Sequence, residues 1–234
     1  MQWREGTADW NNLTSSMTED EYGLGGLALS GVALDIGAYI GGVTVGLLAD
    51  NPNLSVISVE PIPENLALLR ANAEPSDRLR IVAGAVGHGE IRYDYEGDDG
   101  RVDDFAGQHR YYGNTFGFDL YCAGRPHKTV NAPVVTLSDL VPEGEIALCK
   151  IDCEGGEYGF LDDPGVGRIR LIVGEWHPND GGSPDAIRAL LSATHHVTIY
   201  PHPASGPGNF RAVRRLDPPE AIHPDRRRQM GLAR

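Results

Sequence analysis

The stretch "GVALDIGAYIGG" (Gly31–Gly42) decides the fold that the sequence predicts. Its apolar first half indicates a buried strand over Gly31–Gly37, and its second half is a turn rich in glycine. Glycines allow the backbone to turn sharply and to approach a ligand closely, and the N–H groups of a helix from Gly42 to about Ala49 would follow. A strand, a glycine turn and a helix in this order are typical of a nucleotide site at the carboxyl end of a sheet.

Apolar runs and helical patterns alternate beyond this stretch, which predicts an α/β fold with a doubly wound, mostly parallel sheet. The runs "HVTIYP" and "GNFRAVRR" predict an antiparallel pair, and therefore an antiparallel strand, at the edge of the sheet. We expect further strands at Leu54–Glu60, at Leu79–Gly87 with its turn, at Ala132–Leu140 as a short strand and turn, at Ile146–Asp152 and at Ile169–His177, and helices at Pro63–Ala73 and Ser183–His195.

The chain of 234 residues fits a single domain, because it shows no repeat and no linker. Residues 1–30 form an N-terminal extension to this domain. Residues 90–127 have no clear periodicity, and such a long irregular segment is usually functional, so we expect a substrate or lid segment there. Its aromatic and histidine side chains either line that lid or are ordinary surface residues: His109, Tyr111, Tyr112 and His127.

The formal net charge of −13 argues against general binding to nucleic acid, which requires clustered cations. The basic run Arg226–Arg228 is an exception, and it indicates either a solvated tail or a contact with a phosphate or a partner. No apolar run approaches the roughly 20 residues that span a bilayer, and the N-terminus lacks the pattern of a secretory signal. We therefore expect a cytoplasmic protein without a membrane partner, and the composition allows a homodimer.

The three cysteines, Cys122, Cys149 and Cys153, show no C-x-x-C spacing, so a disulfide framework or a zinc site is not expected. Cys149 and Cys153 flank the expected strand "IALCKID", where a free cysteine behaves as a small hydrophobic residue.

The glycine turn has the pattern D-x-G-x-x-x-G, formed by Asp35, Gly37 and Gly41. Tyr39 occupies the middle glycine of the dinucleotide fingerprint, which argues against a nicotinamide dehydrogenase. An acid at Asp35 repels a pyrophosphate but attracts a sulfonium group, and Glu60 at the end of the next strand is placed to take two ribose hydroxyls. These features favour S-adenosylmethionine as the cofactor. The alternative is a helix-start turn with acids that face solvent.

Several stretches resemble the FkbM family of S-adenosylmethionine-dependent methyltransferases. They are "VALDIGAYIGGVTV", "SVEPIPENLALLRANA", "AGAVG", "LCKIDCEGGEYGFL" and "IVGEWH", and "REGTADW" and "EDEYGL" resemble the stretch before the family's first strand. The resemblance covers roughly Arg4 to His177, and its most specific part is the run K-I-D-C-E-G-G-E. Gly156 stands where the family often has alanine, and residues 90–127 match no pattern of the family.

The resemblance implies the class I methyltransferase fold, with its Rossmann-like sheet and the cofactor across the carboxyl ends of the strands. It also implies methyl transfer to hydroxyl oxygens, often on sugars or natural products. By position, Asp35, Gly37 and Gly41 would line the methionine and ribose part of the cofactor, and Glu60 would bind the ribose. The adenine would lie near Pro61, in a pocket formed partly by Ala85 and Val86.

The stretch "KIDCEGGEY" (Lys150–Tyr158) carries the candidate catalytic residues. Side chains alternate along a strand, so Lys150 and Asp152 point the same way, and Glu154 joins them if the extended backbone continues. Asp152 is the first candidate to face the methyl acceptor, as a base, as an orienter of the hydroxyl or as a metal ligand. Lys150 would hold its charge in a partly buried site or lower the pKa of a bound hydroxyl. Glu157 would either start a helix or take part in catalysis.

Glu175 and His177 end the adjacent strand and should share one side with Asp152. His177 is a candidate general base because an unperturbed imidazole titrates near neutrality, although a hydrogen-bonded structural role is an equal alternative. No metal site is expected, since these acids match no recognised metal loop, but a divalent cation held by Asp152, Glu154 or Glu175 is an alternative.

The sequence therefore predicts an O-methyltransferase that acts on a hydroxyl of a small molecule, such as a sugar or a natural-product intermediate. Two alternatives stay open, namely methylation of the ribose 2'-hydroxyl of RNA and a module that binds S-adenosylmethionine without catalysis.

Overall fold

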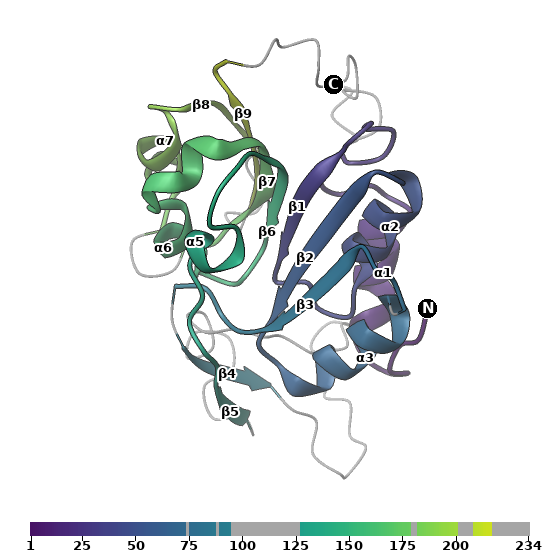
Figure 1. The fold of residues 1–234 in the computed structure, drawn as a ribbon. Coiled ribbons are helices and arrows are strands. Elements are labelled where there is room, and N and C mark those ends of the chain that lie inside the picture. Colours follow the sequence, from purple (N-terminus) through teal and green to yellow (C-terminus); the bar gives the residue numbers. More distant parts are fainter. Residues whose placement is uncertain (74, 88, 95–126, 179–181, 201–207, 217–234) are drawn as a thin grey trace, which may run out of the picture.

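A mixed sheet of seven strands forms the centre of the protein in the computed structural model, which describes residues 1–73, 75–87, 89–94, 127–178, 182–200 and 208–216 (Figure 1). The strands lie in the order β3-β2-β1-β6-β7-β9-β8. Their bounds are β1 Gly31–Ile36, β2 Leu54–Glu60, β3 Leu79–Ala83, β6 Ile146–Ile151, β7 Ile169–Trp176, β8 His195–Tyr200 and β9 Gly208–Arg214.

Helices cover both faces of the sheet, as the alternating pattern predicts (Figure 1). One apolar cluster joins the sheet to α5, α6, η1 and α7, and a second joins it to α2. The helices are α1 Asp9–Met17, α2 Gly42–Asp50, α3 Pro63–Ala73, α5 Leu137–Leu140, α6 Glu157–Leu161 and α7 Pro184–Leu191, with the 3-10 helix η1 Pro164–Arg168. The predicted doubly wound class I methyltransferase fold is confirmed.

Strands β1, β2, β3, β6 and β7 run parallel to one another. The predicted antiparallel pair at the edge is also confirmed, because β9 is antiparallel to both β7 and β8. The strand that runs against the others is β9, one place in from the edge. The outermost strand, β8, points the same way as β7.

Two predicted elements differ from the structure. The strand expected at the start of Ala132–Leu140 is reduced to a bridge between Val134 and Ala85, and the rest is the short helix α5. This helix forms because Thr136 and Asp139 make a capping box at its start. The helix expected to reach His195 ends at Leu191, and His195 instead begins β8.

The prediction of irregular structure over residues 90–127 is wrong at the two ends of this segment. There β4 (Glu90–Asp94) pairs with β5 (His127–Asn131) as a small antiparallel sheet. His109, Tyr111 and Tyr112 lie outside the described residues, as do Cys122 and Arg226–Arg228, and only the backbone of His127 is described.

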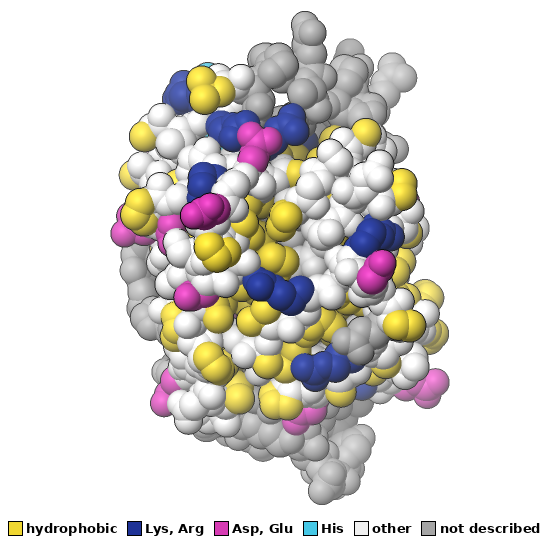
Figure 2. Space-filling view, in the orientation of Figure 1, with side chains coloured by type: hydrophobic (Ala, Val, Ile, Leu, Met, Phe, Trp, Pro, Cys, Tyr) yellow, Lys and Arg dark blue, Asp and Glu magenta, His cyan; other side chains and the backbone are white. Residues whose placement is uncertain are grey.

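Hydrophobic side chains gather at the centre of the face shown in Figure 2, with Lys and Arg side chains between them. The apolar cluster that includes α5, α6 and α7 also packs against partly buried residues of β1, β2 and β3, namely Val32, Ile57 and Val82. None of the helices in the described ranges combines the length and the apolarity that crossing a membrane requires.

Candidate functional site

A cavity of about 260 Å³ lies at the carboxyl ends of the parallel strands, where ligands bind in open α/β sheets. Most of the predicted site residues line it: Gly37, Glu60, Pro61, Ala85, Val86, Lys150, Asp152 and Glu175. Three predicted residues, Asp35, Gly41 and His177, do not line it. The N-terminal segment contributes further lining residues that have no role in the sequence-based prediction, among them Leu13, Ser16, Glu21 and Tyr22.

The glycine turn packs directly against the end of β6. Gly37 has a φ of 72°, and a Cβ atom there would lie 1.8 Å from the carbonyl oxygen of Asp152. Only glycine tolerates both the left-handed backbone and this contact. Gly41, with a φ of 94°, caps the start of α2 and packs on Leu69. The first glycine thus joins the predicted cofactor turn to the predicted catalytic strand.

Glu60 lies at the end of β2, where it is 4% exposed and accepts three hydrogen bonds. The backbone N–H of Tyr39 donates to Oε2 at 2.9 Å, and the N–H of Ile62 and the amide of Asn65 donate to Oε1 at 3.0 and 3.2 Å. Burial raises the pKa of Glu60 to about 7, although these donors oppose the shift. Because the described residues give Oε2 a single donor, this oxygen keeps a lone pair for a ligand hydroxyl at the cavity wall.

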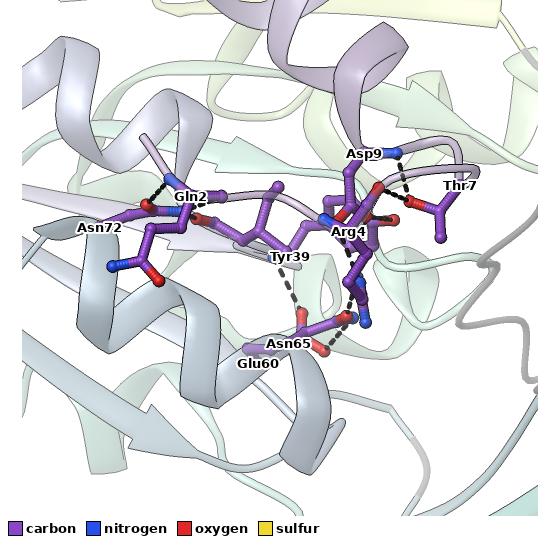
Figure 3. Close-up of polar contacts among 9 residues, drawn as sticks. Gln2, Arg4, Thr7, Asp9, Tyr39, Glu60, Asn65 and Asn72 are labelled. Atoms are coloured by element: carbon purple, nitrogen blue, oxygen red, sulfur yellow. Dashed lines mark hydrogen bonds and ion pairs between the residues drawn. The ribbon is translucent and has the colours of Figure 1, made fainter.

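The N-terminal segment is tied to this part of the site by a network of polar side chains (Figure 3). The fully buried Asp9 pairs with Arg4 and accepts a hydrogen bond of 2.6 Å from the hydroxyl of Tyr39. Arg4 also donates to Asn65, the residue that holds Glu60. Tyr39 itself has a φ of 53°, an uncommon value for a residue with a side chain. This network fixes the cofactor turn from the side of the N-terminus.

Asp35 and Lys150 form a buried pair behind the turn. The Nζ atom of Lys150 lies 3.4 Å from Oδ1 of Asp35, while Oδ2 of Asp35 accepts a hydrogen bond from Thr44. Burial lowers the pKa of Lys150, but the carboxylates of Asp35 and Asp152 outweigh it and raise the pKa above its usual value.

The ammonium group of Lys150 also donates to the carbonyl oxygens of Gly37 and Ile36, at 2.7 and 3.4 Å. These contacts show that Lys150 holds the glycine turn in place. The predicted contact of Asp35 with the cofactor stays a prediction, and the structure gives this carboxylate Lys150 as its partner.

Asp152 lies directly after β6 and lines the cavity. Among the described residues, only one of its two carboxylate oxygens accepts a hydrogen bond. Its Oδ2 accepts a hydrogen bond of 2.8 Å from the hydroxyl of Tyr22, and its Oδ1 lies 3.9 Å from Nε2 of His177. The predicted proximity of Asp152 and His177 across the sheet is confirmed. Tyr22 was missed, although "EDEYGL" is among the stretches that resemble the family.

His177 is surrounded by carboxylates at the end of β7. Its Nδ1 binds Oε1 of the buried Glu157, and its Nε2 lies 3.3 Å from Oε2 of Glu154 and 3.6 Å from Oε2 of Glu175. Burial lowers the pKa of the imidazole, but Glu154, Glu157 and Asp152 raise it to about 10. This shift favours the protonated imidazole, whereas a general base acts from the neutral form.

The acids around His177 are themselves affected by burial and by one another. Burial raises the pKa of Glu154 to about 7, and burial together with the charge of Asp152 raises that of Glu175 to about 9. The extended backbone that would align Glu154 with Lys150 and Asp152 does not continue to this residue. Its φ of 59° turns the chain back, and this turn brings its carboxylate to His177. Glu157 does begin a helix, α6, and it also orients His177.

The residues around the cavity fit S-adenosylmethionine. Glu60 offers an oxygen for the ribose, and Pro61, Ala85 and Val86 provide apolar wall beside it. The acidic side chains of Glu21, Asp152 and Glu175 line the other end, where a sulfonium group would favour their ionised forms and be attracted to them. The donor set of the cavity therefore matches the chemistry of this cofactor.

Comparison with known proteins agrees with this assignment. The model of the methyltransferase FkbM domain matches residues 35–200. The chain is 30% identical over 191 residues to 31-O-demethyl-FK506 methyltransferase FkbM of Streptomyces tacrolimicus. The aligned region covers 72% of this chain and 73% of that protein.

Among solved structures, the chain is similar to precorrin-6y C5,15-methyltransferase from Geobacter metallireducens, at 13% identity and a TM-score of 0.47, over 92% of this chain and 93% of that one. It is also similar to the N-methyltransferase NodS from Bradyrhizobium japonicum in complex with S-adenosyl-l-homocysteine, at 9% identity and a TM-score of 0.48, over 88% and 87%. These scores are too low to support an argument about function. The family match and the sequence identity over most of the chain show that this protein belongs to the FkbM family of S-adenosylmethionine-dependent methyltransferases.

Proposed function

We propose that the protein transfers a methyl group to a hydroxyl oxygen of a small molecule, such as a sugar or a natural-product intermediate. The observation that carries this proposal is the position of Asp152. Its carboxylate lines the cavity, Tyr22 holds one of its oxygens, and its backbone carbonyl touches the cofactor turn at Gly37. A carboxylate so fixed beside the cofactor turn can orient a neutral hydroxyl for attack.

The side chains divide the work. When bound, S-adenosylmethionine supplies an electrophilic methyl group. Oδ1 of Asp152 accepts the hydrogen bond of the acceptor hydroxyl and takes its proton as the new C–O bond forms, while Tyr22 holds the other carboxylate oxygen. Lys150 holds the carbonyl groups of the turn, and Leu13 and Ser16 of α1 cover the cavity and reduce its access to water.

Two further observations support a small hydroxylated acceptor. The name of the relative from Streptomyces tacrolimicus states methylation of an oxygen, in a molecule called 31-O-demethyl-FK506. Acids line the acceptor end of the cavity, and the formal net charge is −13, both of which disfavour the phosphate backbone of RNA. Both observations therefore support a small acceptor rather than the ribose of RNA.

The test is methyl transfer from S-adenosylmethionine with a carbon-13 methyl group to a panel of glycosides, hydroxylated lactones and an RNA oligonucleotide. We expect a product whose carbon-13 chemical shift is that of a methyl ether, formed from a small acceptor. A methylated nitrogen or carbon, or methylation of RNA alone, would contradict the proposal. If S-adenosylhomocysteine binds by calorimetry and no member of the panel is methylated, the non-catalytic module becomes the better explanation.

A further inference from the structure

Three side chains at the ends of β6 and β7 present metal-ligating atoms to one point. Asp152, Glu175 and His177 each offer one such atom, and the three atoms lie within 4.8 Å of one another. Nε2 of His177 is 3.9 Å from Oδ1 of Asp152 and 3.6 Å from Oε2 of Glu175. The two carboxylates line the cavity, so the point that all three face lies at its wall.

The histidine supplies an observation that is independent of the acids. His177 is 5% exposed, and the fully buried Glu157 binds its Nδ1. This contact aims Nε2 at the acids, where it lies 3.3 to 3.9 Å from carboxylate oxygens of Glu154, Glu175 and Asp152 without an aligned hydrogen bond to a described residue. A ligating imidazole is neutral, so a bound ion would displace the proton of Nε2. A histidine whose second nitrogen is held by a carboxylate is the usual arrangement of a metal ligand, because that carboxylate fixes the ring and increases its basicity.

We propose that Asp152, Glu175 and His177 bind a divalent cation of the Mn²⁺ type at the wall of the cavity. Carboxylate oxygens suit Mg²⁺ and Mn²⁺, and an imidazole favours the transition metal of the two. Neighbouring ligands of an octahedral ion with bonds of about 2.1 Å lie about 3 Å apart, so the two acids have to move toward Nε2 by roughly 1 Å. Glu154, 3.3 Å from Nε2, is close enough to balance the charge of the ion.

The ion would extend the proposed function, on which this consequence rests. Three protein ligands leave positions of an octahedral ion free for the acceptor, and a coordinated hydroxyl has a lowered pKa. Asp152 would then fix the acceptor through the ion. An acceptor with two neighbouring oxygens, such as a vicinal diol, would occupy two of these positions.

The test is a titration of the complete chain with MnCl₂, without S-adenosylmethionine or acceptor, followed by the electron paramagnetic resonance signal of free Mn²⁺. We expect one bound ion per chain, with a nitrogen-14 coupling of the imidazole in the electron spin echo signal. Asp152→Asn and Glu175→Gln should each weaken binding at least about tenfold, and His177→Gln should remove the nitrogen coupling. Glu157→Gln, which changes only the partner of Nδ1, should weaken binding by about 10-fold to 100-fold.

The matched control is Asp185→Asn, the same change at a fully exposed acid of α7, and it should bind Mn²⁺ as the wild type does. Circular dichroism and calorimetry with S-adenosylhomocysteine show that each variant is folded. Bound Mn²⁺ without nitrogen coupling, or wild-type affinity for Mn²⁺ in either Asp152→Asn or Glu175→Gln, would overturn the proposal, as would the absence of binding at millimolar Mn²⁺. These measurements need no acceptor, so a failure here leaves the proposed methyl transfer standing, and a failure to methylate any hydroxyl leaves the metal site standing.

Discussion

The acidic side chains at the two ends of the cavity differ in number and in their hydrogen-bond partners. At the β2 end, the single carboxylate of Glu60 has three N–H donors from the surrounding chain. At the β6 and β7 end, Asp152, Glu154 and Glu175 surround one imidazole, with few hydrogen bonds among them. At the first end, the described chain supplies hydrogen-bond donors to both carboxylate oxygens of Glu60, and a ligand hydroxyl can add one more. The second end packs several carboxyl groups around one imidazole, and this raises the pKa of Glu154 to about 7, of Glu175 to about 9 and of His177 to about 10. A cation bound there would displace protons from these groups.

The sharpest test of this contrast is Asp152→Asn. The change keeps the shape and the contact with Tyr22 but removes the charge at the acceptor end, so kcat/KM for methyl transfer should fall by about 10³-fold. The affinity for S-adenosylhomocysteine should stay within a few-fold of the wild-type value, because the ribose is bound at the other end. Calorimetry and a transfer assay on the same preparation measure both quantities. An equal loss of affinity and rate would show that the two ends are not separate.

Gly37→Ala tests the seam between the two ends. Its Cβ would lie 1.8 Å from the carbonyl oxygen of Asp152, in a backbone conformation that a side chain disfavours. We expect the free energy of unfolding to fall by at least about 3 kcal/mol. Gly46→Ala in α2 is the matched control, since nothing lies within 4 Å of its Cβ position, and urea denaturation compares the two. Equal stability of both variants would refute the tight seam.

The pH dependence of stability should reveal the burial of Glu60. Its pKa is about 7 in the folded chain against an ordinary value of 4.5, so the folded state keeps a proton that the unfolded chain loses. The stabilising contribution of this proton is complete below pH 4.5 and is lost as the pH rises through 7, by up to about 3 kcal/mol.

Urea denaturation of the ligand-free protein between pH 5 and pH 8 should therefore show a shallower fall in Glu60→Gln than in the wild type. Glu143→Gln, at an exposed position, makes the same change where the environment is solvent. If Glu60→Gln and the wild type lose stability with the same slope, the Glu60 carboxylate is ionised throughout this pH range. The contrast between the two ends of the cavity is then smaller than proposed.

The smallest effect is expected for Tyr39→Phe. The change removes the hydrogen bond from the Tyr39 hydroxyl to Asp9, and with it one tie between the N-terminal segment and the cofactor turn. A hydrogen bond to a charged group contributes about 1.5 to 3 kcal/mol. Faster proteolysis of residues 1–27, with little change in the thermal unfolding of the remainder, should follow. Tyr200→Phe on the far edge strand is the control, and an identical rate of proteolysis in both variants would exclude the tie.

The sequence predicts the fold well because the apolar runs of β1, β2, β6 and β7 are continuous and each ends in a distinct signal. Glu60 and Asp152 could be placed for the same reason, as both directly follow strands. The position of Glu154 could not be predicted, because the alternation of a strand stops where a left-handed residue begins. The pairing of Lys150 with Asp35 could not be predicted either, because sequence alone does not show that two side chains on neighbouring strands face each other.

The N-terminal contribution was the larger omission. Arg4, Asp9 and Tyr22 reach the site from segments without strand periodicity, and only a tertiary structure shows which side chains they meet. Conversely, β4 and β5 were missed because a pair of short strands far apart in the chain carries little local signal.

The place of β9 between β7 and β8 affects the order in which the sheet can form during synthesis. Residues 35–177 include every predicted site residue and leave the ribosome before Gly208–Arg214, the strand that gives β7 its outer neighbour. Until this strand emerges, Glu175 lies on a strand with one open edge, and β8 has no described strand with which to pair. The nascent chain can thus contain the whole cofactor turn while its acceptor end is still unfinished, and chaperones that shield strand edges would act in this interval.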